Sequence, residues 1–194
     1  MQLVVYKTLN LYGKTVLPGS KSQSIRGMFF ALLAKGKSIL FNVVDSEDTQ
    51  NAMQICRALG AEIILQDSTL FLTSNGFPFT HVAHEIHTGN SGITTRFILP
   101  LLGLRKNYMS SIFVTCSEQM QARPIKSLID ALNVLGMFIQ YAEQEEQFPI
   151  LVSGQLKGGE VEIDGITSQY LSALLISLPC AQEDSVYMNV PILR

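Results

Sequence analysis

The sequence predicts an α/β fold built from tandem units, and three observations lead to this prediction. Three segments begin with small polar residues and then become apolar, starting at Ser22, Ser91 and Ser168, which are 69 and then 77 residues apart. Small polar residues cap helix N-termini, and an apolar circumference indicates a helix that is buried on most sides. Strand-like apolar runs separate these segments, and a repeat of this length is typical of tandem structural units.

A second, amphipathic helix is expected after each of the first two buried helices. Segments 48–61 and 123–137 carry apolar residues at helical spacing, and Gly60 and Gly136 stand where a left-handed C-cap is expected. Pro124 suits the first turn of the second segment, which would leave Arg123 at the tip of that helix. Each unit therefore runs strand, buried helix, strand, amphipathic helix and strands. The expected units span about 14–80 and 81–155, with 156–194 as an incomplete third.

Composition narrows the class of protein. The chain has 194 residues, of which 47% are hydrophobic and 15% charged, so it can bury a sizeable core. A net charge of −2 gives no general reason to expect nucleic acid or an acidic membrane as a partner. Three cysteines lie far apart without a CxxC pair, and the first residues lack the pattern of a signal peptide. We expect a cytoplasmic, soluble protein.

The helix starts also carry groups that bind anions. Lys21 and Arg26 flank the beginning of the first buried helix, directly after a strand-like run and a Pro-Gly turn. Helix N-termini present free N–H groups and a partial positive charge. A second Gly-rich loop, 88–92, opens a helix with Arg96 in its first turns, and a third polar start lies at 167–169. Several such tips suit a ligand with more than one anionic group.

At this point the residues resemble the EPSP synthase family. The motifs occur in the family's order along nearly all of the chain: Pro18-Gly19-Ser20-Lys21-Ser22, Ser24, Arg26, Asp45-Ser46-Glu47-Asp48-Thr49, Leu59-Gly60-Ala61, Gly89-Asn90-Ser91-Gly92, Arg96, Arg123-Pro124-Ile125 and Ser168-Gln169. The resemblance implies an enolpyruvyl transferase-type fold of two lobes, each made of three βαβαββ units with buried helices inside and sheets outside. Residues 1–194 would be most of the N-terminal lobe, without the C-terminal lobe.

The resemblance also implies a reaction, in which an enolpyruvyl group passes from phosphoenolpyruvate to the 5-hydroxyl of shikimate 3-phosphate and phosphate is released. The family needs no metal and no organic cofactor. Lys21 would be the catalytic residue and, with Arg123, would hold phosphoenolpyruvate. Gly92 would let the backbone approach that substrate closely, and Asn90 and Arg96 would support the loop.

Shikimate 3-phosphate would take a second set of residues by the same resemblance. Ser22 and Arg26 would hold the ring and its substituents, and Thr167 and Ser168 would bind the 3-phosphate. Gln169 would lie between the two substrates. Thr167 stands where Ser is commoner in the family, a change that keeps the hydroxyl.

Two alternatives differ in activity. The related UDP-N-acetylglucosamine enolpyruvyl transferase has Lys-Asn after the Gly turn and a reactive Cys five residues before the Arg-Pro pair. This chain has Ser22 and Glu118 at those positions, and Cys116 is two residues away. A non-catalytic or truncated substrate-binding module of the same fold is the other alternative, and we expect little activity from the chain without the second lobe.

The three histidines of segment 81–87 are spaced by three and could suggest a metal site. Their segment is strand-like or irregular, and on a strand that spacing alternates faces. We therefore predict no metal site there.

Overall fold

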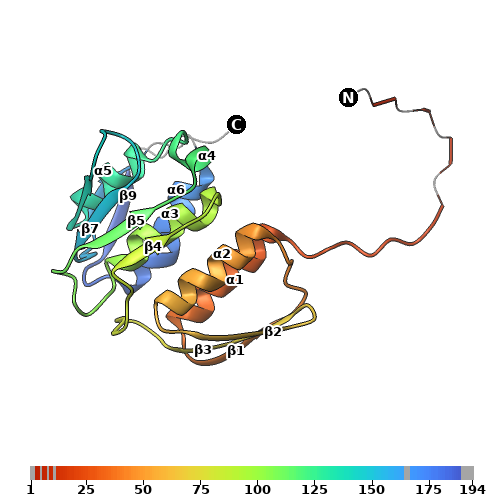
Figure 1. Ribbon diagram of the computed structural model, residues 1–194, viewed down its shortest axis with the longest axis horizontal. Coiled ribbons are helices and arrows are strands. Elements are labelled where there is room, and N and C mark those ends of the chain that lie inside the picture. The colour runs from red at the N-terminus through yellow and green to blue at the C-terminus, as the bar shows by residue number, and fades with distance from the viewer. Residues whose placement is uncertain (1–2, 5, 8, 11, 164–166, 189–194) are drawn as a thin grey trace.

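The computed structural model describes residues 3–4, 6–7, 9–10, 12–163 and 167–188 and has the α/β character that the sequence predicted (Figure 1). The helices are α1 (Lys21–Leu33), α2 (Glu47–Ala58), α3 (Gly92–Leu102), α4 (Glu118–Gln121), α5 (Lys126–Val134) and α6 (Ser168–Ser177), followed by a 3₁₀ turn at Leu178–Cys180. The strands are β1 (Lys35–Leu40), β2 (Glu62–Gln66), β3 (Thr69–Asn75), β4 (Glu85–His87), β5 (Ile112–Thr115), β6 (Met137–Tyr141), β7 (Ile150–Gly154), β8 (Gly159–Glu162) and β9 (Ser185–Met188).

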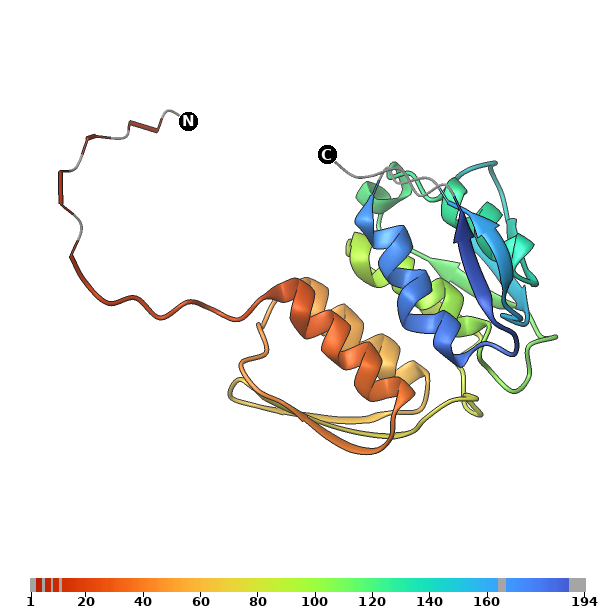
Figure 2. The same ribbon diagram turned by 180° about the vertical axis from the view of Figure 1, so that it is seen from behind.

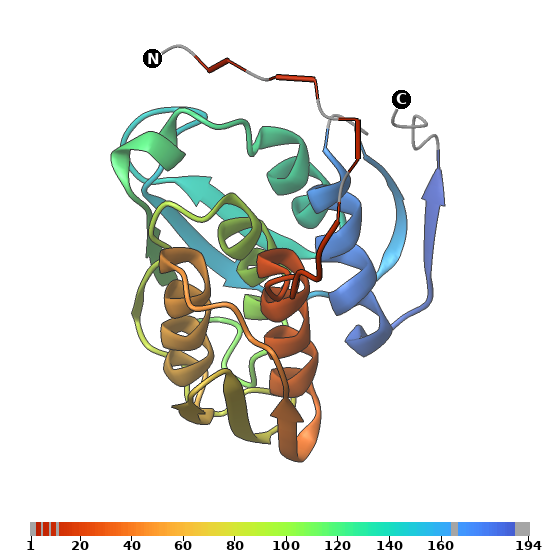
Figure 3. The same ribbon diagram turned by 90° about the vertical axis from the view of Figure 1, so that its right-hand side faces the viewer.

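The first part of the chain is a three-stranded antiparallel sheet covered on one face by two helices. The strand order is β1-β3-β2, and α1 and α2 lie side by side over it (Figure 3). Burial alternates along β3, with Leu70 and Leu72 turned to the helices and Phe71 to the outside. This period of two follows from the pleat and leaves the outer face of the sheet in solvent.

The second part repeats the design with a mixed sheet. Its strand order is β4-β5-β7-β6, in which β4 and β5 are parallel and the other neighbours antiparallel. Helix α6 lies against α3, and β8 pairs in parallel with β9 (Figure 2). From β4 to β7 the order is βαβαββ, with the short α4 as an addition that the sequence did not predict.

One expected strand does not form. Residues 12–20, which include the strand-like run before Pro18, are neither helix nor strand and extend away from the helices (Figures 1 and 2). An extended segment becomes a strand only when a neighbour accepts its backbone hydrogen bonds, and no described strand pairs with it. The third expected unit contributes β8, α6 and β9, while residues 164–166 and 189–194 of its span lie outside the described residues.

A continuous hydrophobic core joins the two parts. All eleven residues of α3 are buried, as the apolar circumference predicted, and the Phe29 and Phe97 rings pack 6.0 Å apart between centroids. A phenylalanine buried as completely as these contributes about 2–3 kcal/mol. Burial of α1 and α6 is less complete than predicted, because neighbours cover only some of their faces: Phe30 remains 55% exposed and Leu175 53%.

Arg105 fastens the loop that follows α3. Its guanidinium is buried and donates to the carbonyls of Leu102, Asn107, Tyr108, Ser110 and Val152. Burial lowers its pKa to about 10, which still leaves the side chain charged at neutral pH. The residue therefore joins the loop to the end of α3 through Leu102 and to β7 through Val152. Among the described residues, no helix is long and apolar enough to cross a membrane.

Candidate functional site

Four helix N-termini meet at one cleft of about 310 Å³. Its lining includes residues from the first turns of α1, α2, α3 and α6, namely Lys21, Ser22, Asp48, Gly92, Ile93 and Gln169, together with Asn90 and Arg123 from loops. A hydroxyl caps each of these helices: Ser20, Ser46, Ser91 and Thr167 accept hydrogen bonds from backbone N–H groups two or three residues later. The remaining N–H groups and helix dipoles favour negative charge there.

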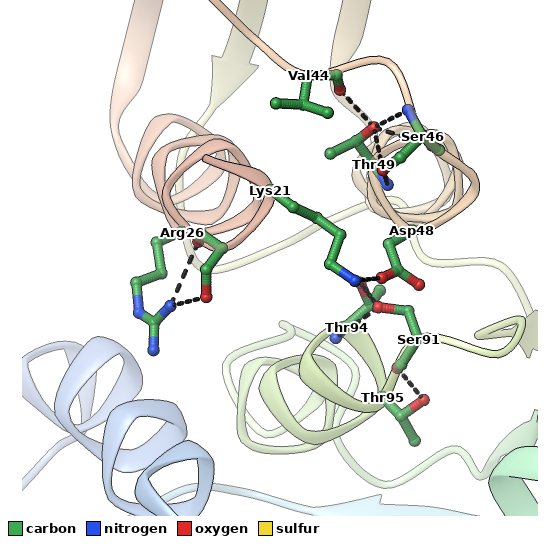
Figure 4. A network of polar contacts seen from close by, with 10 residues as sticks. Lys21, Arg26, Val44, Ser46, Asp48, Thr49, Ser91, Thr94 and Thr95 are labelled. Carbon is green, nitrogen blue, oxygen red and sulfur yellow. Dashed lines mark hydrogen bonds and ion pairs between the residues drawn. The ribbon is translucent and has the colours of Figure 1, made fainter. Parts of the chain in front are cut away.

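The charged side chains of the cleft are two cations and one carboxylate. Lys21 contacts Asp48 directly across the gap between α1 and α2 (Figure 4). Arg123 is exposed and no described residue accepts a hydrogen bond from its guanidinium. Within the described part of the chain, the cleft therefore presents one cation without a hydrogen-bond partner and one paired cation beside several helix N-termini, which is an arrangement for an anion.

Gly92 leaves room for guanidinium groups. A Cβ at this position would lie 2.6 Å from Nη1 of Arg96 and 3.1 Å from Nη1 of Arg123. Both contacts are closer than carbon and nitrogen atoms normally pack, so a side chain would push one or both arginines away. The glycine thus keeps two cations next to the first turn of α3.

Arg96 lies beneath the cleft and connects three parts of the chain. Its Nη1 donates to Oε1 of Gln169 at 2.7 Å and its Nη2 to the carbonyl of Pro124 at 2.9 Å, while the guanidinium lies 5.5 Å from the ring centroid of Tyr170. The residue is only 6% exposed, and desolvation by burial lowers its pKa. It holds Gln169 and the 123–125 segment in place instead of lining the cleft.

Arg26 leaves α1 in another direction from Lys21 (Figure 4). Its Nη1 donates to Oγ of Ser22 at 2.6 Å and its Nη2 to Oγ of Ser172 on α6 at 3.2 Å, and it lies 5.3 Å from the Phe97 ring centroid. Of the predicted site residues, Arg26, Arg96, Thr167 and Ser168 do not line the cleft itself. Arg26 reaches it through Ser22, and Thr167 caps the helix that carries Gln169.

Arg123 does not lie at the tip of a helix, so that prediction is wrong. Helix α5 begins at Lys126, and Ile125 is its N-cap, with a φ of −139°. The reason is the carbonyl of Pro124, which accepts hydrogen bonds from Arg96 and from the hydroxyl of Tyr170 at 2.7 Å. These contacts hold the segment in a loop conformation.

Two residues in or beside the cleft, Asp48 and Gln119, have a role that the sequence did not predict. Asp48 belongs to a recognised motif, but nothing local indicates that it pairs with Lys21, 27 positions earlier. Gln119 accepts a hydrogen bond from Nδ2 of Asn90 at 2.8 Å, which ties the Gly-rich loop to α4. Both contacts join segments far apart in the sequence. The one sequence signal for them is that a strand-like run precedes each loop, because loops that follow neighbouring parallel strands lie at the same edge of a sheet.

The cysteine and histidine side chains that the sequence raised as candidates for a nucleophile or a metal site do not line the cleft. Cys116 is buried and burial raises the pKa of its thiol to about 11, so it is not poised as a nucleophile. The histidines at 81, 84 and 87 are exposed, and His87 accepts a hydrogen bond from the backbone N–H of Gly89. Among the described residues no group of three or more His, Cys, Asp or Glu could hold a metal ion.

A family model, sequence relatives and solved structures that resemble this chain all carry the same family description. A family model described as EPSP synthase (3-phosphoshikimate 1-carboxyvinyltransferase) matches residues 5–193. The chain is 39% identical over 173 residues to the 3-phosphoshikimate 1-carboxyvinyltransferase of Acetivibrio thermocellus, covering 89% of this chain and 40% of that protein. The chain is 40% identical over 178 residues to the protein of the same name from Klebsiella pneumoniae, covering 90% of this chain and 41% of that protein.

The chain thus spans about two fifths of the length of these relatives. A solved EPSP synthase from Acinetobacter baumannii has the same fold, with a TM-score of 0.82 at 23% identity, over 94% of this chain and 41% of that one. The family model covers almost every residue, and the α/β architecture agrees with the solved structure. The chain belongs to the EPSP synthase family.

Proposed function

We propose that this chain forms most of the N-terminal lobe of an enzyme that transfers an enolpyruvyl group from phosphoenolpyruvate to shikimate 3-phosphate. The observation that carries the proposal is the meeting of four capped helix N-termini with Lys21 and Arg123 at one cleft. Both substrates are polyanions, and the family's relatives are named for this transfer. The units would span about 14–80, 81–155 and 156–194.

In this proposal the two substrates divide the residues of the site. Phosphoenolpyruvate lies between Lys21 and Arg123 beside Gly92, where the backbone of α3 is uncovered by a side chain. Shikimate 3-phosphate contacts Ser22, Arg26 and the start of α6 at Thr167 and Ser168. Gln169, held by Arg96, lies between them.

The chemistry that these residues support is electrostatic. The 5-hydroxyl loses its proton and adds to the enol carbon while the methylene carbon takes up a proton, and the tetrahedral adduct then loses phosphate and one methyl proton to restore the double bond. Fixed cations and N–H groups next to the phosphate stabilise charge as it develops, and holding two reactants in place removes much of the entropic barrier. No step in this lobe needs a cofactor.

Proton transfer is the part that the cleft leaves open. Its one carboxylate among the described lining residues is Asp48, which is bound to Lys21. A general acid or base must be free to exchange its proton with the substrate. We therefore infer that the chain alone binds shikimate 3-phosphate but turns over little, and that the remaining length of its relatives supplies the missing groups.

The test separates binding from catalysis. Calorimetry of the 194-residue chain should show binding of shikimate 3-phosphate and none of shikimate, which lacks the phosphate. Phosphate release should be negligible for the chain alone and should appear when the remaining C-terminal portion of the Klebsiella pneumoniae relative is added. Binding without release under both conditions favours the non-catalytic module instead, and no binding contradicts the proposal.

A further inference from the structure

Asp48 is a carboxylate in a cleft otherwise suited to anions. Its side chain is 19% exposed, and Lys21, with which it pairs, is 54% exposed. The other lining residues are neutral or, in the case of Arg123, positively charged. The carboxylate therefore neutralises the cation that an incoming anion would contact.

The position of Asp48 is set by the start of α2. Ser46 and Thr49 form a reciprocal capping box, and the buried Thr49 hydroxyl also donates to the carbonyl of Val44 at 2.7 Å (Figure 4). One turn later, Asn51 packs on Gly89 so closely that a Cβ on the glycine would lie 2.0 Å from Nδ2 of Asn51. The first turn of α2 is thus held on two sides, which fixes the backbone that carries the Asp48 carboxylate.

We propose that Asp48 is a positioning residue for Lys21 and an internal competitor of the phosphoenolpyruvate anion. It directs the ammonium group into the cleft, and its negative charge opposes a second anion on the same cation. This inference rests on the proposed function, because it assigns the phosphoenolpyruvate site to Lys21. A fixed carboxylate that holds the lysine spares the substrate the cost of ordering a flexible side chain, but it weakens ground-state binding by like-charge repulsion.

Each role predicts its own measurable effect of one substitution, the first on the orientation of Lys21 and the second on the affinity for phosphoenolpyruvate. Asp48→Asn keeps the shape of the side chain and removes its charge, so phosphoenolpyruvate should bind about five to ten times more tightly as the repulsion is lost. Lys21 should at the same time lose its fixed orientation. Asp48→Glu restores the charge and can reach the same ammonium, so both properties should return toward those of the unchanged protein.

The experiment uses the 194-residue chain with saturating shikimate 3-phosphate and titrates phosphoenolpyruvate by calorimetry. Orientation of Lys21 is followed from the ¹³C resonance of its dimethylated amine, identified by its absence in Lys21→Met. Glu47→Gln is the matched control, since Glu47 lies in the same helical turn and is exposed, and it makes no ion pair in the described structure. The control should leave affinity and resonance unchanged.

Tighter binding in Asp48→Asn, a shifted Lys21 resonance and recovery in Asp48→Glu support the inference. Equal or weaker binding in Asp48→Asn overturns it, and so does an equal gain in Glu47→Gln, which would mean a general effect of net charge. Failure of the proposed function looks different, because the unchanged chain would then not bind shikimate 3-phosphate.

Discussion

Two arginines that lie against the same glycine should lose different properties when each is replaced by lysine. Arg96 and Arg123 both approach Gly92, but Arg96 is 6% exposed and Arg123 is exposed. Lysine keeps the charge of arginine but cannot reproduce its fork of donors. Arg96→Lys should therefore lower stability, and Arg123→Lys should lower ligand affinity.

The magnitude for Arg96 follows from its partners. Loss of the charged hydrogen bond to Gln169 costs about 1.5–3 kcal/mol, and the Pro124 carbonyl, which keeps its bond from Tyr170, adds about 1 kcal/mol at most. The expected loss is about 2–4 kcal/mol. Arg123→Lys should change stability by less than about 0.5 kcal/mol, as surface substitutions do, and should weaken phosphoenolpyruvate binding about tenfold.

Urea denaturation followed by circular dichroism measures the first effect. With a slope near 2 kcal/mol per molar, the Arg96→Lys midpoint should fall by about 1–2 M. Calorimetry with phosphoenolpyruvate in the presence of shikimate 3-phosphate measures the second. Equal losses of stability in the two variants would refute the reasoning, because the difference in burial would then have no consequence.

Three further outcomes are expected. Arg26→Ala should weaken shikimate 3-phosphate binding by about 1.5–3 kcal/mol, the range for a hydrogen bond to a charged group, and calorimetry that finds no change would contradict the assignment. Burial raises the thiol pKa of Cys56 to about 12 and that of Cys116 to about 11. Both thiols should therefore resist iodoacetamide at pH 8 in the native protein, because little thiolate exists below those values. Mass spectrometry should find both cysteines alkylated only after unfolding. Arg105→Met should cost about 3–5 kcal/mol in urea denaturation, since five carbonyls each lose one donor, although those of Asn107 and Tyr108 keep another. Lys106→Met at the exposed neighbouring position should cost almost nothing.

The local features of this fold could be predicted from the sequence. Each polar helix start does provide a hydroxyl cap, because a cap depends on a side chain and a backbone group only two or three residues away. Ser91 is the cap that the sequence indicated, whereas the other two caps are Ser20 and Thr167, two residues and one residue before the predicted Ser22 and Ser168. Gly60 and Gly136 have positive φ values after α2 and α5 for the same local reason. The buried character of α3 followed from its composition.

The tertiary structure decided what lies beyond the reach of local pattern. Residues 12–20 look like a strand but have no described neighbour to pair with, and α5 starts late because distant groups use the Pro124 carbonyl. The roles of Arg96 and Arg123 differ through burial, which no spacing encodes.

For this protein, the sequence by itself determined the tandem α/β units, the polar starts of the buried helices and the family to which the motifs belong. Those properties depend on short-range periodicity and capping, which are written in neighbouring residues. Only the tertiary structure decided that Lys21 faces Asp48 and that Arg96 holds Gln169. Such pairs join helices separated by tens of residues, so they depend on how the helices pack, and packing is a property of the whole core.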